Sequence, residues 1–395
     1  MSADLPKTYR FLSLSDLPDH QKSDAPQECS AESAAVLNET LADLGVQPEG
    51  KSVGAAVTRY YVRLPEGMSL GKLMGLKNEL SMRLHGADLL IGAGEERNTA
   101  FIDVPNSVRA VVSWKQAMLS QTCAEHTSGL SFVLGQTPDG STQIVDLVRL
   151  PHLLVGGASG AGKSIFLHAM LVSLFCRYSP EEVRFVLMDL KGTESDIFSD
   201  LPHLARPVVR DAAEAVRVLG CAIAEMERRY SLMRQKAEQG IVVRNLDEYN
   251  LAVSEDERLP RIVIAADEYA DILLCEKKGF VENVVTLARK ARAAGIHLVF
   301  STQRCSAEVL SGDLLANFPS RIALRVATEA ESRRLLGQSG AQSLVCAGDM
   351  LLHTAEMLSC RRVQGVFIAD RDVRTLVQEI RALDDARPAL SAFCS

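Results

Sequence analysis

No long hydrophobic run is present in this sequence. The longest apolar stretch, around residues 167–175, is far shorter than the roughly 20 residues that a membrane-spanning helix needs, and the N-terminus lacks the charged-then-apolar order of a secretion signal. The nine cysteines are scattered and never form a C-x-x-C pair, which argues against a disulfide framework and against a zinc site. We therefore expect a cytoplasmic chain with no membrane segment of its own.

An excess of positive charge is also missing. The formal net charge of −7 argues against a surface uniformly coated for nucleic acid, although a narrow channel lined by a few arginines stays compatible with it. The eight histidines show no paired ligand spacing, and no internal repeat is found. With 395 residues, 47% of them hydrophobic, the chain is long enough for two or three domains with a sizeable core.

One motif matches the phosphate-binding loop pattern G-x-x-x-x-G-K-[ST] without a mismatch. It consists of Gly157, Ala158, Ser159, Gly160, Ala161, Gly162, Lys163 and Ser164. An apolar stretch at 153–155 precedes it and a helix-like stretch at 165–172 follows it, which is the strand-loop-helix context that the motif requires. Glycines let successive backbone N–H groups converge on phosphate oxygens, and the helix start adds partial positive charge. The motif predicts ATP binding, with Lys163 at the β/γ-phosphates and Ser164 on Mg²⁺; a Gly-rich turn of no function is the alternative.

An acidic pair supplies the second half of the expected site. The apolar run at 262–266 ends in Asp267 and Glu268, as when a buried strand delivers acids to the edge of a sheet. Asp267 is expected to hold the Mg²⁺ shell through water, and Glu268 to orient and deprotonate the attacking water. A helix cap or a surface carboxylate pair is the competing interpretation. The strand at 297–302 ends at Gln303, whose amide we expect to sense the γ-phosphate.

The order of elements after Lys163 favours an α/β fold. Expected strands at 184–189, 262–266 and 297–301 alternate with expected helices at 212–233 and 280–294, which predicts a mostly parallel sheet with helices on both faces. Three more strands are expected at 321–326, 350–353 and 362–368, and a hairpin at 130–134 and 142–147 leads into the loop.

The chain is expected to divide into four parts. We assign a mobile arm to residues 1–30, a small α+β domain to 31–107, a RecA-like P-loop ATPase motor to 108–370, and a C-terminal helix and tail to 371–395. Within the small domain, helices are expected at 31–44 and 70–84 and strands at 56–64, 89–91 and 100–104.

Further segments resemble the FtsK/SpoIIIE family of ATP-driven double-stranded DNA translocases. The resemblance lies in residues 151–157, 226–230, 243–250, 267–271, 290–297, 302–304 and 348–351. Several of these stretches have no role in generic ATPases, so their joint order is more specific than the loop alone. The resemblance spans roughly 53–370, and the part before the loop resembles the domain that precedes the motor in that family.

The resemblance implies a homo-oligomeric ring, normally hexameric, around duplex DNA, with ATP held between neighbours. Arg292 matches the arginine that one subunit supplies to the γ-phosphate in the next; a basic helix face that only meets solvent is the alternative. Arg304 and Arg333 match positions that grip DNA phosphates, with salt bridges as the competing explanation. The sequence departs from the family at Glu329, where Lys is common and where a carboxylate would repel phosphates.

Three functions follow in order of preference. The first is an ATP-hydrolysing, ring-forming duplex DNA translocase. The second is an FtsK-like ATPase that couples hydrolysis to protein or nucleoprotein export, and the third is a scaffold whose assembly ATP controls. We expect no membrane-spanning anchor like that of the cell-division members, and no winged-helix domain after the motor because only about 25 residues remain beyond Asp370. The N-terminal arm is a candidate contact for a protein partner.

Overall fold

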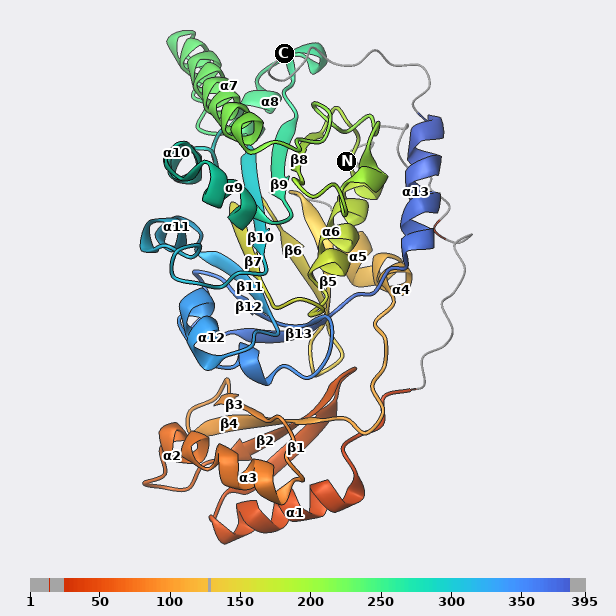
Figure 1. Cartoon of the computed structure of the whole chain (residues 1–395), viewed down its shortest axis with the longest axis vertical. Helices are drawn as coiled ribbons and strands as arrows, with labels where there is room; N and C mark the ends of the chain where they lie inside the picture. Colours follow the sequence, from red (N-terminus) through yellow and green to blue (C-terminus); the bar gives the residue numbers. More distant parts are fainter. Residues whose placement is uncertain (1–13, 15–24, 127–128, 384–395) are drawn as a thin grey trace.

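The computed structural model of this chain describes residues 14, 25–126 and 129–383. Two sheets follow one another along its long axis, a small one built from the N-terminal third and a large one built from the rest (Figure 1). Most of the arm expected at 1–30, namely residues 1–13 and 15–24, lies outside the described residues, as does the tail at 384–395.

The small sheet is antiparallel and has the strand order β1-β2-β4-β3. Its strands are β1 (Gln47–Val53), β2 (Val57–Arg63), β3 (Leu90–Ala93) and β4 (Thr99–Pro105). Its core includes Leu37, Leu41, Val62 and Ile102, with helix α1 (Ala31–Asp43) supplying the two leucines. The sequence pattern missed β1 because this edge strand is polar and almost fully exposed, so no alternation marks it.

Two other expectations for this region need correction. The helix expected at 70–84 is two helices, α2 (Leu70–Gly75) and α3 (Lys77–Arg83), and the break follows Gly75, the residue type with the highest helix cost after proline. Residues 25–30 were placed in the mobile arm, yet they pack on the small sheet. The Gln27 N–H donates to the Val108 carbonyl at 3.0 Å, and Cys29 is buried with its sulfur 3.1 Å from the Tyr60 hydroxyl.

The large sheet has nine strands in the order β6-β5-β13-β12-β11-β7-β10-β9-β8. Its parallel half consists of β11 (Ser320–Leu324), β7 (His152–Gly156), β10 (Ile296–Thr302), β9 (Arg261–Ala266) and β8 (Val183–Met188). Its antiparallel half consists of β12 (Asp349–His353), β13 (Arg361–Gly365), β5 (Ser131–Gln136) and β6 (Thr142–Asp146). The predicted α/β core is confirmed, and the strands with continuous apolar sequence form its buried parallel half.

Helices cover both faces of the large sheet, and each face has its own core. Successive residues of a strand point to opposite faces, so Leu153 and Val155 pack on one side and Leu154 on the other. The first side is covered by α4 (Trp114–Met118), α5 (Gln121–Glu125), α6 (Lys163–Arg177) and α13 (Asp370–Leu383) (Figure 1). The second is covered by α7 (Ala212–Glu238), α9 (Tyr269–Cys275), α10 (Lys277–Lys290), α11 (Gly312–Asn317) and α12 (Glu329–Leu336), with α8 (Leu246–Leu251) packed against α7.

Candidate nucleotide-binding site

The glycine-rich loop lies where β7 ends and α6 begins. Gly160 and Gly162 have φ values of 74° and 100°, in the left-handed region that favours glycine. A Cβ on Gly162 would also meet the Gly348 nitrogen at 2.6 Å, so this position accepts no larger residue without a backbone shift. The Ala158 N–H donates to the Arg325 carbonyl at 2.8 Å and ties the loop to the neighbouring strand. The first-turn N–H groups of α6 have no carbonyl partner within the helix, which makes its start a site for anions.

The structure brings Lys163 together with the acidic pair that follows β9. Lys163 Nζ lies 2.9 Å from Asp267 Oδ1, 3.0 Å from the Asp267 carbonyl and 3.9 Å from Glu268 Oε2. All three residues are buried, at 5%, 8% and 8% exposure, which is incompatible with a surface carboxylate pair. Burial of these charges is tolerable because they compensate one another.

Glu268 occupies the N-cap position of α9, but its carboxylate turns toward β10 instead of capping that helix. Its Oε1 accepts a hydrogen bond from the Thr302 hydroxyl at 2.5 Å, and its Oε2 accepts one from the Gln303 backbone N–H at 2.7 Å. Gln303 therefore meets the acidic pair through its main chain, while its side chain is exposed. Sequence analysis missed Thr302, because an ordinary strand residue gives no signal of its own.

Ser164 has a partner that sequence analysis did not predict. Its hydroxyl donates to Glu194 Oε1 at 2.8 Å, and His168 Nε2 lies 3.0 Å from the Glu194 carbonyl. The loop that carries Glu194 is organised by Asp189 at the end of β8. That carboxylate accepts four backbone hydrogen bonds of 2.9 to 3.1 Å, from Lys191, Gly192, Glu194 and Ser195. An acid at a strand end is the only sequence signal that points to this loop.

The three arginines singled out from the sequence lie in different places. Arg292 is exposed and lies in the turn between α10 and β10, not on the helix expected at 280–294, which ends at Lys290. This turn is at the start of β10, whereas the phosphate loop follows the end of the adjacent β7, so the two are at opposite edges of the sheet. Arg304 Nη2 lies 3.7 Å from Asp271, and Arg333 pairs with Glu329 at 2.6 Å along α12. Arg304 and Arg333 thus each lie in an ion pair within the chain. Such ion pairs are the interpretation that competes with DNA contacts for these two residues.

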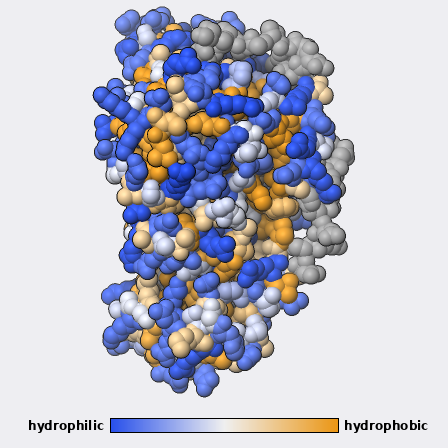
Figure 2. All heavy atoms as spheres, in the orientation of Figure 1, coloured by the Kyte–Doolittle hydropathy of each residue, from blue (hydrophilic) through white to orange (hydrophobic). Residues whose placement is uncertain are grey.

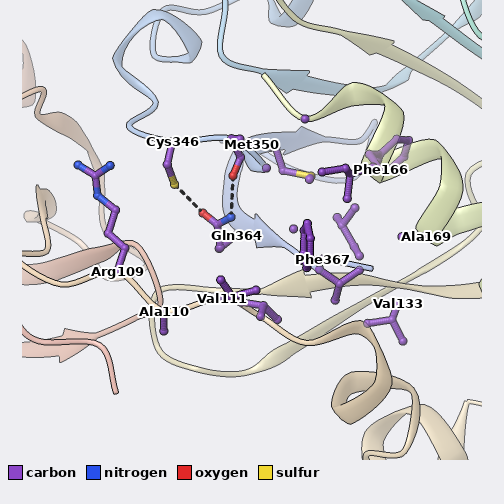
Figure 3. A pocket seen from close by; sticks show the side chains of 18 residues that line it. Arg109, Ala110, Val111, Val133, Phe166, Ala169, Cys346, Met350, Gln364 and Phe367 are labelled. Carbon is purple, nitrogen blue, oxygen red and sulfur yellow. Dashed lines mark hydrogen bonds between the residues drawn. The ribbon is translucent and has the colours of Figure 1, made fainter. Parts of the chain in front are cut away.

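A cavity of about 320 Å³ lies beside the phosphate loop. Gly162, Ile165 and Phe166 line it on the loop side, and residues 109–112 together with 364–367 close it from the other. Figure 3 shows Arg109, Cys346 and Gln364 at one end and the apolar residues Phe166, Ala169 and Val133 toward the other. Gln364 is held by two contacts, from its Nε2 to the Ala347 carbonyl at 3.1 Å and from the Cys346 sulfur to its Oε1 at 3.2 Å. The cavity is therefore mostly apolar, with polar side chains at one end.

Comparison with known proteins decides the family. Residues 115–307 match the FtsK/SpoIIIE family, and residues 10–106 match the FtsK alpha domain. The chain belongs to the FtsK/SpoIIIE family. DNA translocase FtsK of Clostridium tetani is 35% identical over 382 residues, which is 94% of this chain and 51% of the relative. DNA translocase FtsK of Oceanobacillus iheyensis is 37% identical over 370 residues, 91% of this chain and 47% of the relative. The chain thus spans about half the length of these curated FtsK relatives.

Solved structures confirm the P-loop ATPase fold of this FtsK-family chain. The conjugation coupling protein TcpA of pCW3, in its monomer form with ATPγS, aligns with a TM-score of 0.60 at 20% identity, over 88% of this chain and 99% of TcpA. The cytoplasmic domain of the type VII secretion ATPase EccC of Thermomonospora curvata aligns with a TM-score of 0.56 at 25% identity, over 67% of this chain and 32% of EccC. Within the described ranges, no helix is long and apolar enough to cross a membrane. The face of the molecule drawn in Figure 2 carries polar and apolar residues side by side.

Proposed function

We propose that this chain is the motor of an ATP-driven translocase that forms a hexameric ring around double-stranded DNA. The observation that carries the proposal is the buried contact of Lys163 with Asp267 and Glu268 at the end of the parallel strands, in a chain of the FtsK/SpoIIIE family. A lysine for phosphate charge and an acid for water are the two groups that phosphoryl transfer to water requires from such a site.

In this proposal the loop binds the phosphates of the nucleotide and the cavity binds its base. The phosphates bind the N–H groups of residues 157–164 and the start of α6, with Lys163 leaving Asp267 to reach the β/γ-phosphates. The adenine ring enters the adjacent cavity against Phe166 and Met350. Its polar edge then faces Gln364, whose amide offers both donor and acceptor atoms.

Mg²⁺ fits the residues around the start of α6. The Ser164 hydroxyl and the carboxylates of Asp267 and Glu194 are hard oxygen donors, which this ion prefers. The Ser164 hydroxyl donates its hydrogen bond to Glu194, so the lone pairs of its oxygen stay available for a cation. When bound, the ion offsets the charge of the phosphates. Glu268 then orients and deprotonates the attacking water.

Arg292 serves the site of a neighbouring subunit. The seven residues of β10 span about 20 Å, so Arg292 at one edge of the sheet does not reach the loop of its own chain at the other. An exposed apolar residue lies near its turn, since the Leu246 N–H at the start of α8 donates to the Ala293 carbonyl and α8 ends in Leu251, which is 84% exposed. An exposed leucine near an exposed arginine is compatible with a contact between protomers.

ATP turnover with and without linear duplex DNA, at low and moderate salt, tests the proposal. The duplex is expected to stimulate the wild type strongly, and higher salt to weaken this effect because phosphate contacts release counterions. Glu268→Gln is expected to keep ATP binding and lose turnover by about a hundredfold or more. Turnover indifferent to DNA would contradict the translocase and favour export coupling, the function named for the similar EccC.

A further inference from the structure

Both oxygens of the Glu268 carboxylate are occupied by donors from β10 and the residue after it. The Thr302 hydroxyl lies 2.5 Å from Oε1, and the Gln303 backbone N–H lies 2.7 Å from Oε2. A carboxylate oxygen that already accepts a hydrogen bond has fewer lone pairs left for a water molecule. A general base must take a proton from water. Glu268 is therefore held in an arrangement that opposes its proposed role.

Thr302 also connects Glu268 with Arg304, the expected DNA contact. Its Oγ1 accepts a hydrogen bond from the Arg304 backbone N–H at 3.0 Å, so one hydroxyl serves both residues. The Arg304 guanidinium in turn lies 3.7 Å from Asp271, in the first turn of the helix that starts after Glu268. A short path of direct contacts thus runs from an exposed cation to the buried base.

Lys191 is a second cation that contacts Asp271. Lys191 Nζ lies 3.2 Å from Asp271 Oδ2, and the Lys191 and Arg304 side chains are 52% and 56% exposed. Exposed ion pairs of this kind are weak, so duplex phosphates compete well with Asp271 for both cations. Lys191 and Arg304 follow the ends of different strands and meet at Asp271, so a phosphate at this place contacts both cations.

We propose that Thr302 is a positioning residue that keeps Glu268 from activating water until DNA phosphates engage Arg304 and Lys191. The inference rests on the proposed translocase function and names how its substrate regulates the ATP site. Phosphates draw Arg304 away from Asp271 and shift residues 302–304. The shift removes the Thr302 hydroxyl and the Gln303 N–H from the Glu268 carboxylate, which is then available to water.

Thr302→Val tests this inference because it keeps the β-branched shape of a fully buried strand residue and removes the hydroxyl. Turnover without DNA is expected to rise about tenfold, the rate equivalent of one hydrogen bond to a charged group. The ratio of turnover with duplex to turnover without it should fall correspondingly, with little change in KM for ATP. Thr302→Ser restores the hydroxyl and should restore the ratio. Thr375→Val, an exposed position on α13, is the matched control and should keep the wild-type ratio.

Two results overturn the inference, and they differ from failure of the proposed function. If the wild type is stimulated by duplex but Thr302→Val keeps the same ratio, Thr302 does not restrain Glu268. The inference is equally wrong if Thr302→Val lowers both rates by the same factor, since Thr302 then supports the active geometry. A wild type that duplex does not stimulate contradicts the translocase itself. Binding of a fluorescent ATP analogue verifies folding, and Thr302→Ala is judged by the same ratio if the valine variant does not fold.

Discussion

Glu194 holds the Ser164 hydroxyl in one orientation. It reaches Ser164 across 30 positions because Asp189 folds the loop between them through four backbone hydrogen bonds. A hydroxyl that binds a cation must direct its proton elsewhere, and Glu194 Oε1 at 2.8 Å is the acceptor. Glu194 therefore orients the Ser164 oxygen toward the position proposed for Mg²⁺.

Glu194→Gln should weaken ATP binding in the presence of Mg²⁺ by about tenfold, the lower end of what loss of a residue that orients a metal ligand costs. Binding in EDTA should be unchanged, because no contact to the phosphates is lost. Titration of a fluorescent ATP analogue under both conditions gives the two dissociation constants. Glu227→Gln, at an exposed position of α7, is the control. An equal loss with and without Mg²⁺ would show that Glu194 acts on the loop and not on the cation site.

Buried histidines have an explanation without any ligand. Burial lowers the pKa of His152 to about 4, and burial followed by the proximity of His152 lowers the pKa of His297 to about 3. The rings therefore stay neutral at neutral pH. His152 Nδ1 accepts the Leu298 N–H at 3.1 Å, so this ring joins β7 to β10 at the start of the two strands.

At the scale of elements, a buried charge cluster joins the small sheet to the large one. Arg362 of β13 contacts Asp103 of β4 at 3.1 Å and Asp349 of β12 at 2.6 and 3.0 Å. Arg59 of β2 completes it with two bonds to Asp103, at 2.7 and 2.9 Å. Burial opposes the charge of Arg362, yet Asp349 and Asp103 together raise its pKa above the usual range. The residue before Asp349, Gly348, donates its N–H to Ala161 of the phosphate loop at 2.8 Å. The cluster thus sets the position of the small sheet relative to the nucleotide site.

Arg362→Met should lower the free energy of unfolding by about 3–5 kcal/mol, because buried Asp349 loses its charged partner and Asp103 keeps only Arg59. Arg59→Met should cost much less, since this side chain is partly exposed and Asp103 keeps Arg362. Urea unfolding followed by circular dichroism compares the two variants. If both variants lose a similar free energy of unfolding, the contact of Arg362 with Asp103 between the sheets stabilises the protein no more than the pair of Arg59 with Asp103 within the small sheet.

At the scale of the whole molecule, the proposed ring requires Arg292 to act between subunits. Lys163→Ala and Arg292→Ala should each abolish most turnover alone, because one lacks phosphate charge and the other lacks the arginine for its neighbour. In rings assembled from an equal mixture, about a quarter of the sites combine an intact loop with an intact arginine, if both variants assemble at random. Turnover with duplex DNA should therefore reappear on mixing.

The control for the mixing experiment is Lys290→Ala, an exposed neighbour of Arg292 that should keep nearly full turnover. If mixtures stay as inactive as the separate variants while both still assemble, the assignment of Arg292 to a neighbouring site is wrong. Assembly with nucleotide and duplex is followed by light scattering, which also reports whether the particle is a hexamer.

The sequence by itself determined the phosphate loop, the acidic pair and the parallel strands that present them. These features are contiguous, and each strand carries its own apolar pattern, so local composition was sufficient for Lys163, Asp267 and Glu268. Only the tertiary structure decided the contacts of Glu194, Thr302 and Arg362 and the existence of the cavity. The contacts of Glu194 with Ser164, of Thr302 with Glu268 and of Arg362 with Asp103 join positions 30 to 259 apart in the chain. No local pattern records which strand ends meet once the sheet has formed.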